Sequence, residues 1–187
     1  MELVLVAVDE PMASAWDTVA NGRDGVRVHR GSVTDLRVDG VVSPANSFGW
    51  MRGGIDGVYS RWLPGIEDRV RAAIAAACPT GPRSDPELAV GSALIVATGT
   101  AAPAWLISAP TMRLPGELLD PSGAAAGAAA RAVLNCWRSG TLPVPDGRPV
   151  RDVVRSLALP GLGTGVGGLS PVTCAARVAE VIDELLA

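Results

Sequence analysis

Residues 160–171 read PGLGTGVGGLSP and place five glycines within eight residues. A leucine- and valine-rich run at residues 153–159 precedes them and predicts a strand. Ser170 then suits a helix N-cap, with Pro171 at the first helical position. Successive backbone N–H groups and a helix N-terminus both favour anions, and the composition is not that of a flexible Gly/Ser linker. The stretch therefore predicts a phosphate-binding loop between a strand and a helix.

Two nucleotide-binding motifs are excluded for this loop. Gly163, Gly165 and Gly168 satisfy G-x-G-x-x-G, but residues 169–187 are too few for a βαβ unit with a downstream ribose-binding acid. A Walker loop requires a lysine, and all sixteen basic residues of the chain are arginine.

The rest of the chain alternates short β-branched runs with longer alanine-rich segments, which indicates an α/β fold. One helix is expected after Asp9, which suits its N-cap, with Pro11 tolerated in the first turn. The other expected helices are residues 66–78, residues 122–137 and a last helix from Ser170 to the C-terminus. The expected strands are residues 3–8, 25–29, 40–43, 92–98, 105–108 and 153–159. No repeat or long linker divides the chain, so we expect one domain over residues 1–187.

An earlier glycine-containing loop, SPANSFGWMRGGIDG, occupies residues 43–57; we call it the first loop, and residues 160–171 the second loop. Pro44 favours an extended exit from the preceding strand, so Asn46 stands at the strand end, where ligands of open α/β sheets bind. Its carboxamide can donate to and accept from the hydroxyls of a ribose, and a turn-forming asparagine is the alternative. Gly53 and Gly54 allow backbone N–H groups to approach a ligand closely.

Asp56 follows this loop at the start of an expected helix. By itself, an aspartate at such a position is more often a helix cap. The functional alternative is a carboxylate that orients water or substrate hydroxyls.

Composition limits the other classes of function. The chain is 48% hydrophobic and 19% charged, which is typical of a soluble globular protein, and its net charge of -3 indicates no general nucleic-acid-binding surface. Cys78, Cys136 and Cys174 contain no CxxC pair, which argues against a disulfide framework and a zinc site. His29 is isolated, and we interpret it as a core or surface histidine, so no metal or cofactor is expected.

The N-terminal apolar run suits a first strand better than a signal peptide, because it begins with Glu2 and stops at Asp9. The alanine-rich residues 124–130 are too few to span a membrane. We therefore expect a cytoplasmic protein that does not bind membranes.

The two loops together resemble the macrodomain family, of which the chain would be a divergent, bacterial-type member. The family's first loop has the pattern N-A-A-N, two residues, Leu, one residue, G-G-G-G-V-D-G. Here residues 43–46 take the first four positions, and the interval from Asn46 to Asp56 is preserved. The second loop resembles the family's [ST]-G-[VI]-[FY]-G at residues 164–168, and residues 31–34 resemble its Gly-Asp-[IV]-Thr element. The resemblance implies a three-layer α/β/α sandwich with a mixed central sheet.

The resemblance also implies ADP-ribose as the ligand, free or attached to a protein or nucleic acid. Asn46 would meet the distal ribose, and Gly53 and Gly54 the distal ribose and phosphates. The residues 164–166 would hold the diphosphate through backbone N–H groups. Asp56 matches the aspartate implicated in hydrolysis, so Asn46 and Asp56 are the expected catalytic residues. The expected ligand-binding residues are Ser32, Val33, Ala45, Gly53, Gly54, Ile55, Gly163, Thr164, Gly165, Val166 and Gly167.

The chain departs from the family pattern in three places, at four residues. Ser32 replaces the aspartate that recognises the adenine amino group, and Gly167 replaces an aromatic residue beside the distal ribose. Met51 and Arg52 replace the first two glycines of the first loop, and Arg52 is either a phosphate partner or a solvated arginine. Phe48 and Trp50 are candidates for the missing ribose wall, with core packing as the alternative. The residues 108–113 follow a strand and are expected to border the cleft.

Three functions follow as hypotheses. The first is hydrolysis of ADP-ribosyl linkages, which the spacing of Asn46 and Asp56 favours. The second is recognition of ADP-ribose without turnover, which Gly167 favours, and the third is binding of another nucleotide or a contact role, which Ser32 favours.

Overall fold

The computed structural model describes residues 1–79 and 84–186. Its centre is a six-stranded sheet with the order β2-β1-β6-β3-β5-β4. Only β4 is antiparallel to its neighbour, so the sheet is mixed. The strands are β1 (Glu2–Ala7), β2 (Val26–Arg30), β3 (Gly40–Ser43), β4 (Leu94–Ala97), β5 (Trp105–Ser108) and β6 (Ser156–Pro160).

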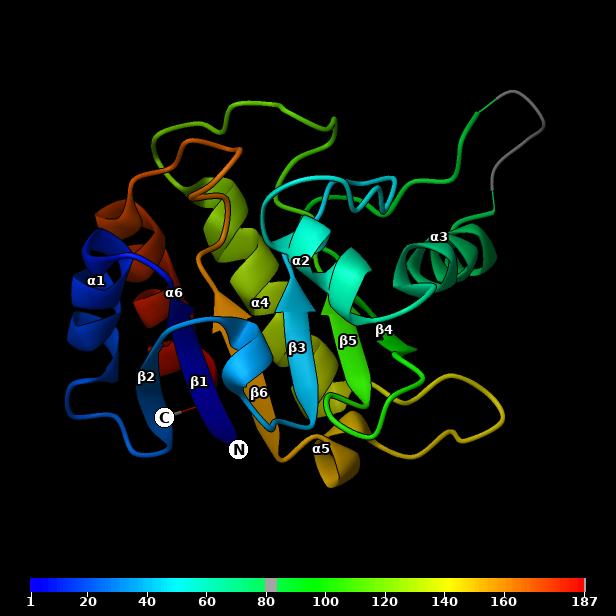
Figure 1. Cartoon of the computed structure of the whole chain (residues 1–187), viewed down its shortest axis with the longest axis horizontal. Coiled ribbons are helices and arrows are strands. Elements are labelled where there is room, and N and C mark those ends of the chain that lie inside the picture. Colours follow the sequence, from blue (N-terminus) through cyan, green and yellow to red (C-terminus); the bar gives the residue numbers. More distant parts are fainter. Residues whose placement is uncertain (80–83, 187) are drawn as a thin grey trace.

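Helices cover both faces of this sheet (Figure 1). The helices α1 (Glu10–Ala20), α4 (Ala124–Ser139) and α6 (Pro171–Leu185) pack together over one face. The helices α2 (Gly54–Trp62) and α3 (Ile66–Ala77) cover the other. A 3-10 turn, η1 (Val33–Asp35), follows β2, and the short α5 (Val150–Val153) precedes β6. The expected α/β/α sandwich with a mixed sheet is therefore confirmed.

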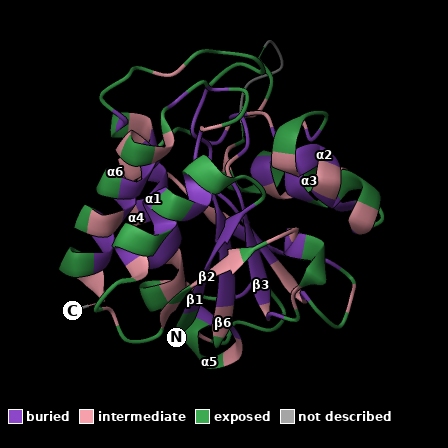
Figure 2. Cartoon of the chain, turned by 60° about the vertical axis from the view of Figure 1, so that its left-hand side comes forward, coloured by how far each residue is buried: buried purple, intermediate pink, exposed green. Residues whose placement is uncertain are grey.

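The alternation of side chains along β1 explains the two layers. Leu3 and Leu5 point into the core beneath α1, α4 and α6, whereas Val4 and Val6 point into the core beneath α2 and α3. All four are buried, and Figure 2 shows the central strands buried while the outer helix faces are exposed. Because both faces are covered, the inner strands β1 and β3 are mostly apolar, whereas the edge strand β2 contains Arg27, His29 and Arg30.

The strand expected at residues 153–159 begins later, at Ser156. Residues 150–153 instead form α5, with Pro149 at its N-cap. The Asp39 carboxylate then accepts hydrogen bonds from the backbone N–H groups of Arg155 and Ser156, which fixes where β6 starts. These two hydrogen bonds join residues that are separated by 116 and 117 positions in the chain, so the local sequence does not reveal them.

The pairing between β3 and β6 is short. It comprises Gly40 with Leu157 and Val41 with Ala158, whereas β1 and β6 share five residue pairs. Beyond Val41 the two strands are no longer paired, although β3 continues to Ser43 and β6 to Pro160. The sheet therefore opens between these strands at their carboxyl ends.

Within the described residues, no helix has the length and apolar character needed to cross a membrane.

Candidate functional site

A cleft of about 740 Å³ lies at the carboxyl ends of β1, β3 and β6. Ligand pockets in proteins span about 300–1,000 Å³, and open α/β sheets bind ligands at this edge, where neighbouring strands diverge. The cleft is lined by the candidate residues of both loops and of the turn after β2: Ser32, Val33, Ala45, Asn46, Gly53, Gly54, Ile55, Asp56, Gly163, Thr164, Gly165, Val166 and Gly167. The structure thus brings the whole predicted set together, while the role of each residue stays a prediction.

The first loop, residues 44–53, is closed by the side chain of Asn46. Its Nδ2 donates to the carbonyl of Trp50 at 2.8 Å, and its Oδ1 accepts from the backbone N–H groups of Phe48 at 3.1 Å and Trp50 at 3.3 Å. The side chain is only 6% exposed. The turn-forming alternative is therefore present in the structure, and a contact between Asn46 and a ribose stays a prediction.

Asp56 lies in the first turn of α2 but does not cap this helix. Gly53 is the N-cap and provides no side-chain hydrogen bond, so the interpretation of Asp56 as a cap is wrong. Its carboxylate instead accepts a hydrogen bond of 2.6 Å from the Ser43 hydroxyl at the end of β3. Because the side chain is buried, the pKa of Asp56 rises from 3.8 to about 7, and the Ser43 hydrogen bond opposes this rise.

A carboxyl group with this pKa exchanges protons near neutrality, which suits an acid–base group. Within residues 1–79 and 84–186, Asp56 is the only buried acidic residue. The cleft therefore contains an acid whose pKa is raised, Asp56, beside a glycine-rich rim.

The N-terminus of α2 leaves backbone N–H groups available at the first loop. Because no side chain caps this helix, the N–H groups of residues 54–56 have no acceptor among residues 1–79 and 84–186. By contrast, Asp9 caps α1 by accepting from Met12 N, and Ser170 caps α6 by accepting from Thr173 N. The helices α3 and α4 also lack a side-chain cap, but only α2 among these uncapped helices has its first turn at the cleft, where anions are stabilised.

The second loop, residues 160–171, provides a row of free donors. The backbone N–H groups of residues 164–167 donate to no acceptor in the described part of the chain. The loop is closed behind them by Gly168 N to Gly165 O and Leu169 N to Gly163 O, both 3.1 Å. Gly163 has φ 72°, which only glycine adopts without strain. Consecutive free N–H groups on a closed turn suit the oxygens of a phosphate.

The two loops approach each other across the mouth of the cleft. Val166 is 49% exposed, and its Cγ2 would stand 4.0 Å from a methyl group placed on Gly53 and 3.9 Å from one on Gly54. Val166 therefore narrows the opening between the loops.

Ser32 and Val33 line the cleft from η1. The Ser32 hydroxyl accepts from Thr34 N at 3.2 Å and lies 2.7 Å from Thr34 Oγ1, and the Asp35 carboxylate accepts from Ser32 N. These bonds form a capping box, so the Ser32 side chain already has partners within its own turn. Val33 is buried in the core below α2 and α3.

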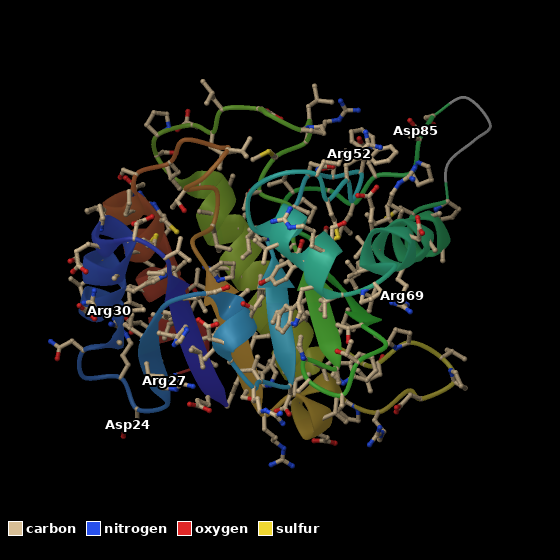
Figure 3. The ribbon with its side chains drawn as sticks, viewed as in Figure 1. Asp24, Arg27, Arg30, Arg52, Arg69 and Asp85 are labelled. Atoms are coloured by element: carbon tan, nitrogen blue, oxygen red, sulfur yellow. The ribbon has the colours of Figure 1, made fainter. Side chains whose placement is uncertain are left out.

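The structure distinguishes between Phe48 and Trp50, the two candidates for the ribose wall. Trp50 lines the cleft, whereas Phe48 is not among the lining residues. Arg52, which is labelled in Figure 3, also lines the cleft, and its guanidinium lies 4.6 Å from the centre of the Trp50 ring. The Arg71 guanidinium lies 3.7 Å from the same ring centre. Arg52 is exposed, and no ion pair joins it to an acid of the described residues.

Local sequence patterns did not identify some of the residues that line the cleft. Val8 and Asp9 follow β1, and their place could have been inferred because parallel strands end at the same edge. Met112 lies in the segment expected to border the cleft, but Pro115 and Gly116 come from the less regular chain after it. Their position depends on long-range hydrogen bonds.

Solved structures define the class of this fold. The macrodomain of Mycobacterium tuberculosis DarG matches with a TM-score of 0.64 and 21% identity, over 84% of this chain and 89% of that chain. Thermosipho africanus DarTG in complex with ADP-ribose matches with a TM-score of 0.62 and 15% identity, over 96% and 50%. The Oceanobacillus iheyensis macrodomain with ADP matches with a TM-score of 0.61 and 18% identity, over 83% and 73%. The chain therefore has the macrodomain fold.

Its sequence relatives are more similar. An uncharacterized protein of Aquifex aeolicus is 32% identical over 157 residues, covering 84% of this chain and 80% of that protein. An uncharacterized protein of Aeropyrum pernix is 30% identical over 159 residues, covering 84% and 66%. The chain belongs to the same family as the Aquifex protein. No protein-family model matches it.

Proposed function

We propose that the cleft binds ADP-ribose and that the protein hydrolyses ADP-ribosyl linkages, releasing ADP-ribose. One observation carries the proposal: two rows of free backbone N–H groups border a single cleft that also contains a buried acid, Asp56. A diphosphate requires such donors, and hydrolysis requires a group that can take up a proton. The solved relatives that contain ADP-ribose or ADP support the same ligand class.

In this proposal the free N–H groups of residues 164–167 bind the diphosphate. The N-terminus of α2, with Gly54 and Ile55, is placed beside the phosphates and the distal ribose. Arg52 provides the positive charge at the mouth of the cleft. No metal or cofactor takes part.

The proposed reaction uses Asp56 as the base. A water oxygen bonds to the anomeric carbon of the distal ribose while one water proton passes to the Asp56 carboxylate. The bond from that carbon to the acceptor group breaks, its electron pair goes to the acceptor atom, and that atom takes up a proton from solvent, while Asp56 releases the proton that it gained. With a pKa of about 7, a substantial share of Asp56 is in the required ionised form at neutral pH.

A second candidate function is recognition of ADP-ribose without turnover. The observation that favours it is the complete use of the Asn46 side-chain oxygen by loop N–H groups, which leaves less of this side chain for a substrate. A module of this kind would bind the ligand and release nothing from a modified protein or nucleic acid.

The first test is a calorimetric titration with ADP-ribose beside AMP and ADP. We expect a Kd of about 1 μM or tighter, equivalent to about -8 kcal/mol, and weaker binding of AMP and ADP. Equal binding of all three nucleotides would assign the cleft to another nucleotide, which is the third hypothesis. Absence of binding would contradict the proposal altogether.

The second test separates the hydrolase from the module that only binds. Asp56→Ala is expected to reduce release of ADP-ribose from modified protein or nucleic acid by about 100-fold or more, since general acid–base groups contribute about that factor. Asp68→Ala, an exposed acid on α3, is the matched control and should leave release unchanged. Binding without release by the unaltered protein would select the recognition module, and unchanged release by Asp56→Ala would refute the role of Asp56.

A further inference from the structure

The chain between β5 and α4 connects the two glycine loops. We name residues 111–119 the strap, and Figure 1 shows this part of the chain arching above both loops. At its first end, Thr111 N donates to Ala45 O at 3.0 Å, and Ser47 N donates to Met112 O at 3.0 Å. Asn46 and Met112 form an isolated parallel bridge at the same place. The strap is therefore fixed to the first loop by backbone contacts on both sides of Asn46.

The middle of the strap is held in a tight turn by Glu117. Its carboxylate accepts from the backbone N–H groups of Arg113 and Leu114, both at 3.0 Å, and its own N–H donates to Leu114 O at 3.2 Å. The turn presents Pro115 and Gly116 to the cleft. The strap therefore forms part of the cleft wall between the loops.

The other end of the strap is fixed to the second loop by Leu119. Its N–H donates to the carbonyl of Gly167 at 2.9 Å. Its side chain fills the space beside two glycines of the loop, because a methyl group on Gly163 would collide with Leu119 Cδ1 and one on Gly167 would stand 2.8 Å from Leu119 Cγ. Both glycines are buried. The carbonyl oxygen of Gly163, 2.7 Å from such a methyl group, also excludes a side chain at Gly167, and the φ of 72° favours glycine at position 163, so Leu119 adds to limits that the loop backbone already sets.

Leu119 differs from the other leucines of the strap. Leu114 is 51% exposed and Leu118 is 77% exposed, whereas Leu119 is half-buried against the second loop. An apolar side chain directed at a glycine loop supports the backbone where that loop has no side chains of its own. The free N–H groups of residues 164–167 lie on the loop segment that Leu119 supports.

We propose that Leu119 is a positioning residue for the second loop, and that the strap sets the distance between the two rows of N–H donors. This inference rests on the proposed function, because it assigns the strap a role in binding ADP-ribose. A loop already held in its binding conformation loses less entropy when a ligand binds, so support from Leu119 raises affinity without touching the ligand.

The experiment compares Leu119→Ala with Leu114→Ala, which removes the same atoms from an exposed position of the strap. We expect Leu119→Ala to weaken ADP-ribose binding by about tenfold, the size of effect that about 1.4 kcal/mol of loop ordering produces, and Leu114→Ala to have little effect. Leu119→Met, which retains apolar volume, should restore most of the affinity.

A second readout needs no ligand. Gly168 N and Leu169 N close the second loop, so their amide hydrogen exchange reports whether the loop stays folded. We expect faster exchange at these two amides in Leu119→Ala, with exchange in the central strands unchanged. If Leu119→Ala does not fold, the same comparison is made with Leu119→Val, which shortens the side chain less.

The outcomes separate the two proposals. Unchanged affinity and unchanged loop exchange in a folded Leu119→Ala variant would overturn the role of Leu119, as would equal effects of Leu119→Ala and Leu114→Ala. Absence of ADP-ribose binding by the unaltered protein would overturn the proposed function, and the exchange measurement would then decide on the support of the loop by itself.

Discussion

The two glycine loops border the same cleft but are built in different ways. The first loop is closed by a side chain, since Asn46 makes three hydrogen bonds to the backbone of Phe48 and Trp50. It leads to Asp56, an acid of raised pKa. The second loop is closed by backbone bonds between its own residues and is supported from outside by Leu119.

The two loops therefore contribute different chemical groups to the cleft. The first loop contributes the side chain that can exchange a proton, and its own Asn46 closes it, although Glu67 and the strap also bond to its backbone. The second loop contributes backbone N–H donors, which do not depend on particular side chains. Because its glycines have no side chains to pack together, its backbone is supported by Leu119, from a distant part of the chain. Substitutions of Asn46 or Asp56 should therefore act directly on the stability or the chemistry of the first loop. The conformation of the second loop should respond to a substitution outside it, at Leu119.

The largest effect is expected at the acid of the first loop. Burial raises the pKa of Asp56 from 3.8 to about 7, so the folded protein holds a proton that the unfolded chain releases in this range. The free energy of unfolding should therefore fall as the pH rises from about 4 to about 7, by an amount on the order of 4 kcal/mol, and change no further above it. Asp56→Asn should lose this dependence and be the more stable protein at pH 8.

The measurement is denaturant unfolding of both proteins from pH 4 to pH 8. The difference between them isolates Asp56, because other carboxyl groups contribute equally to each. Asp68→Asn, at an exposed site, is the control and should follow the unaltered protein. Parallel stability curves for Asp56→Asn and the unaltered protein would contradict the raised pKa.

An intermediate effect is expected where the first loop is closed. Asn46→Ala removes three hydrogen bonds from a buried site and leaves the carbonyl and N–H of Trp50 without these partners. We expect the free energy of unfolding to fall by about 2 kcal/mol, which urea denaturation measures. Asn135→Ala, on the exposed face of α4, should change it by less than about 0.5 kcal/mol. Equal stability of the two variants would mean that Asn46 does not hold the loop.

The smallest effect is expected at the exposed tip of the second loop. Val166 approaches Gly53 and Gly54 but remains 49% exposed, so Val166→Ala should change the free energy of unfolding by less than about 0.5 kcal/mol. Its ADP-ribose affinity should change by less than about threefold, equivalent to about 0.7 kcal/mol. Val172→Ala, at an exposed position of α6, controls for loss of the same atoms. A tenfold loss of affinity for Val166→Ala alone would show that the second loop binds through a side chain.

The sequence was sufficient to predict the sandwich and the meeting of the two loops. Glycine and proline mark the loops strongly, and parallel strands bring their following loops to one edge. The cap at Asp9 was predicted correctly because a cap depends on residues three positions apart.

Other features were not predictable because they depend on contacts between distant residues. A helix cap was one of the two alternatives for Asp56, but the partner of its carboxylate is Ser43, thirteen residues earlier. The support of Gly167 by Leu119 joins positions on different elements, and neither residue has a local pattern that indicates the other. Glycine at position 167 was interpreted as a missing side chain, whereas the structure shows a neighbour occupying that space.

The short pairing between β3 and β6 has a consequence for the whole molecule. The sheet is in effect two half-sheets, β2-β1-β6 and β3-β5-β4, joined along a seam of two residue pairs. The first loop and the strap continue from β3 and β5 of one half, and the second loop continues from β6 of the other. Any change in the angle between the halves is transmitted directly to the width of the cleft, and the bond from Leu119 to Gly167 is a tie across that seam.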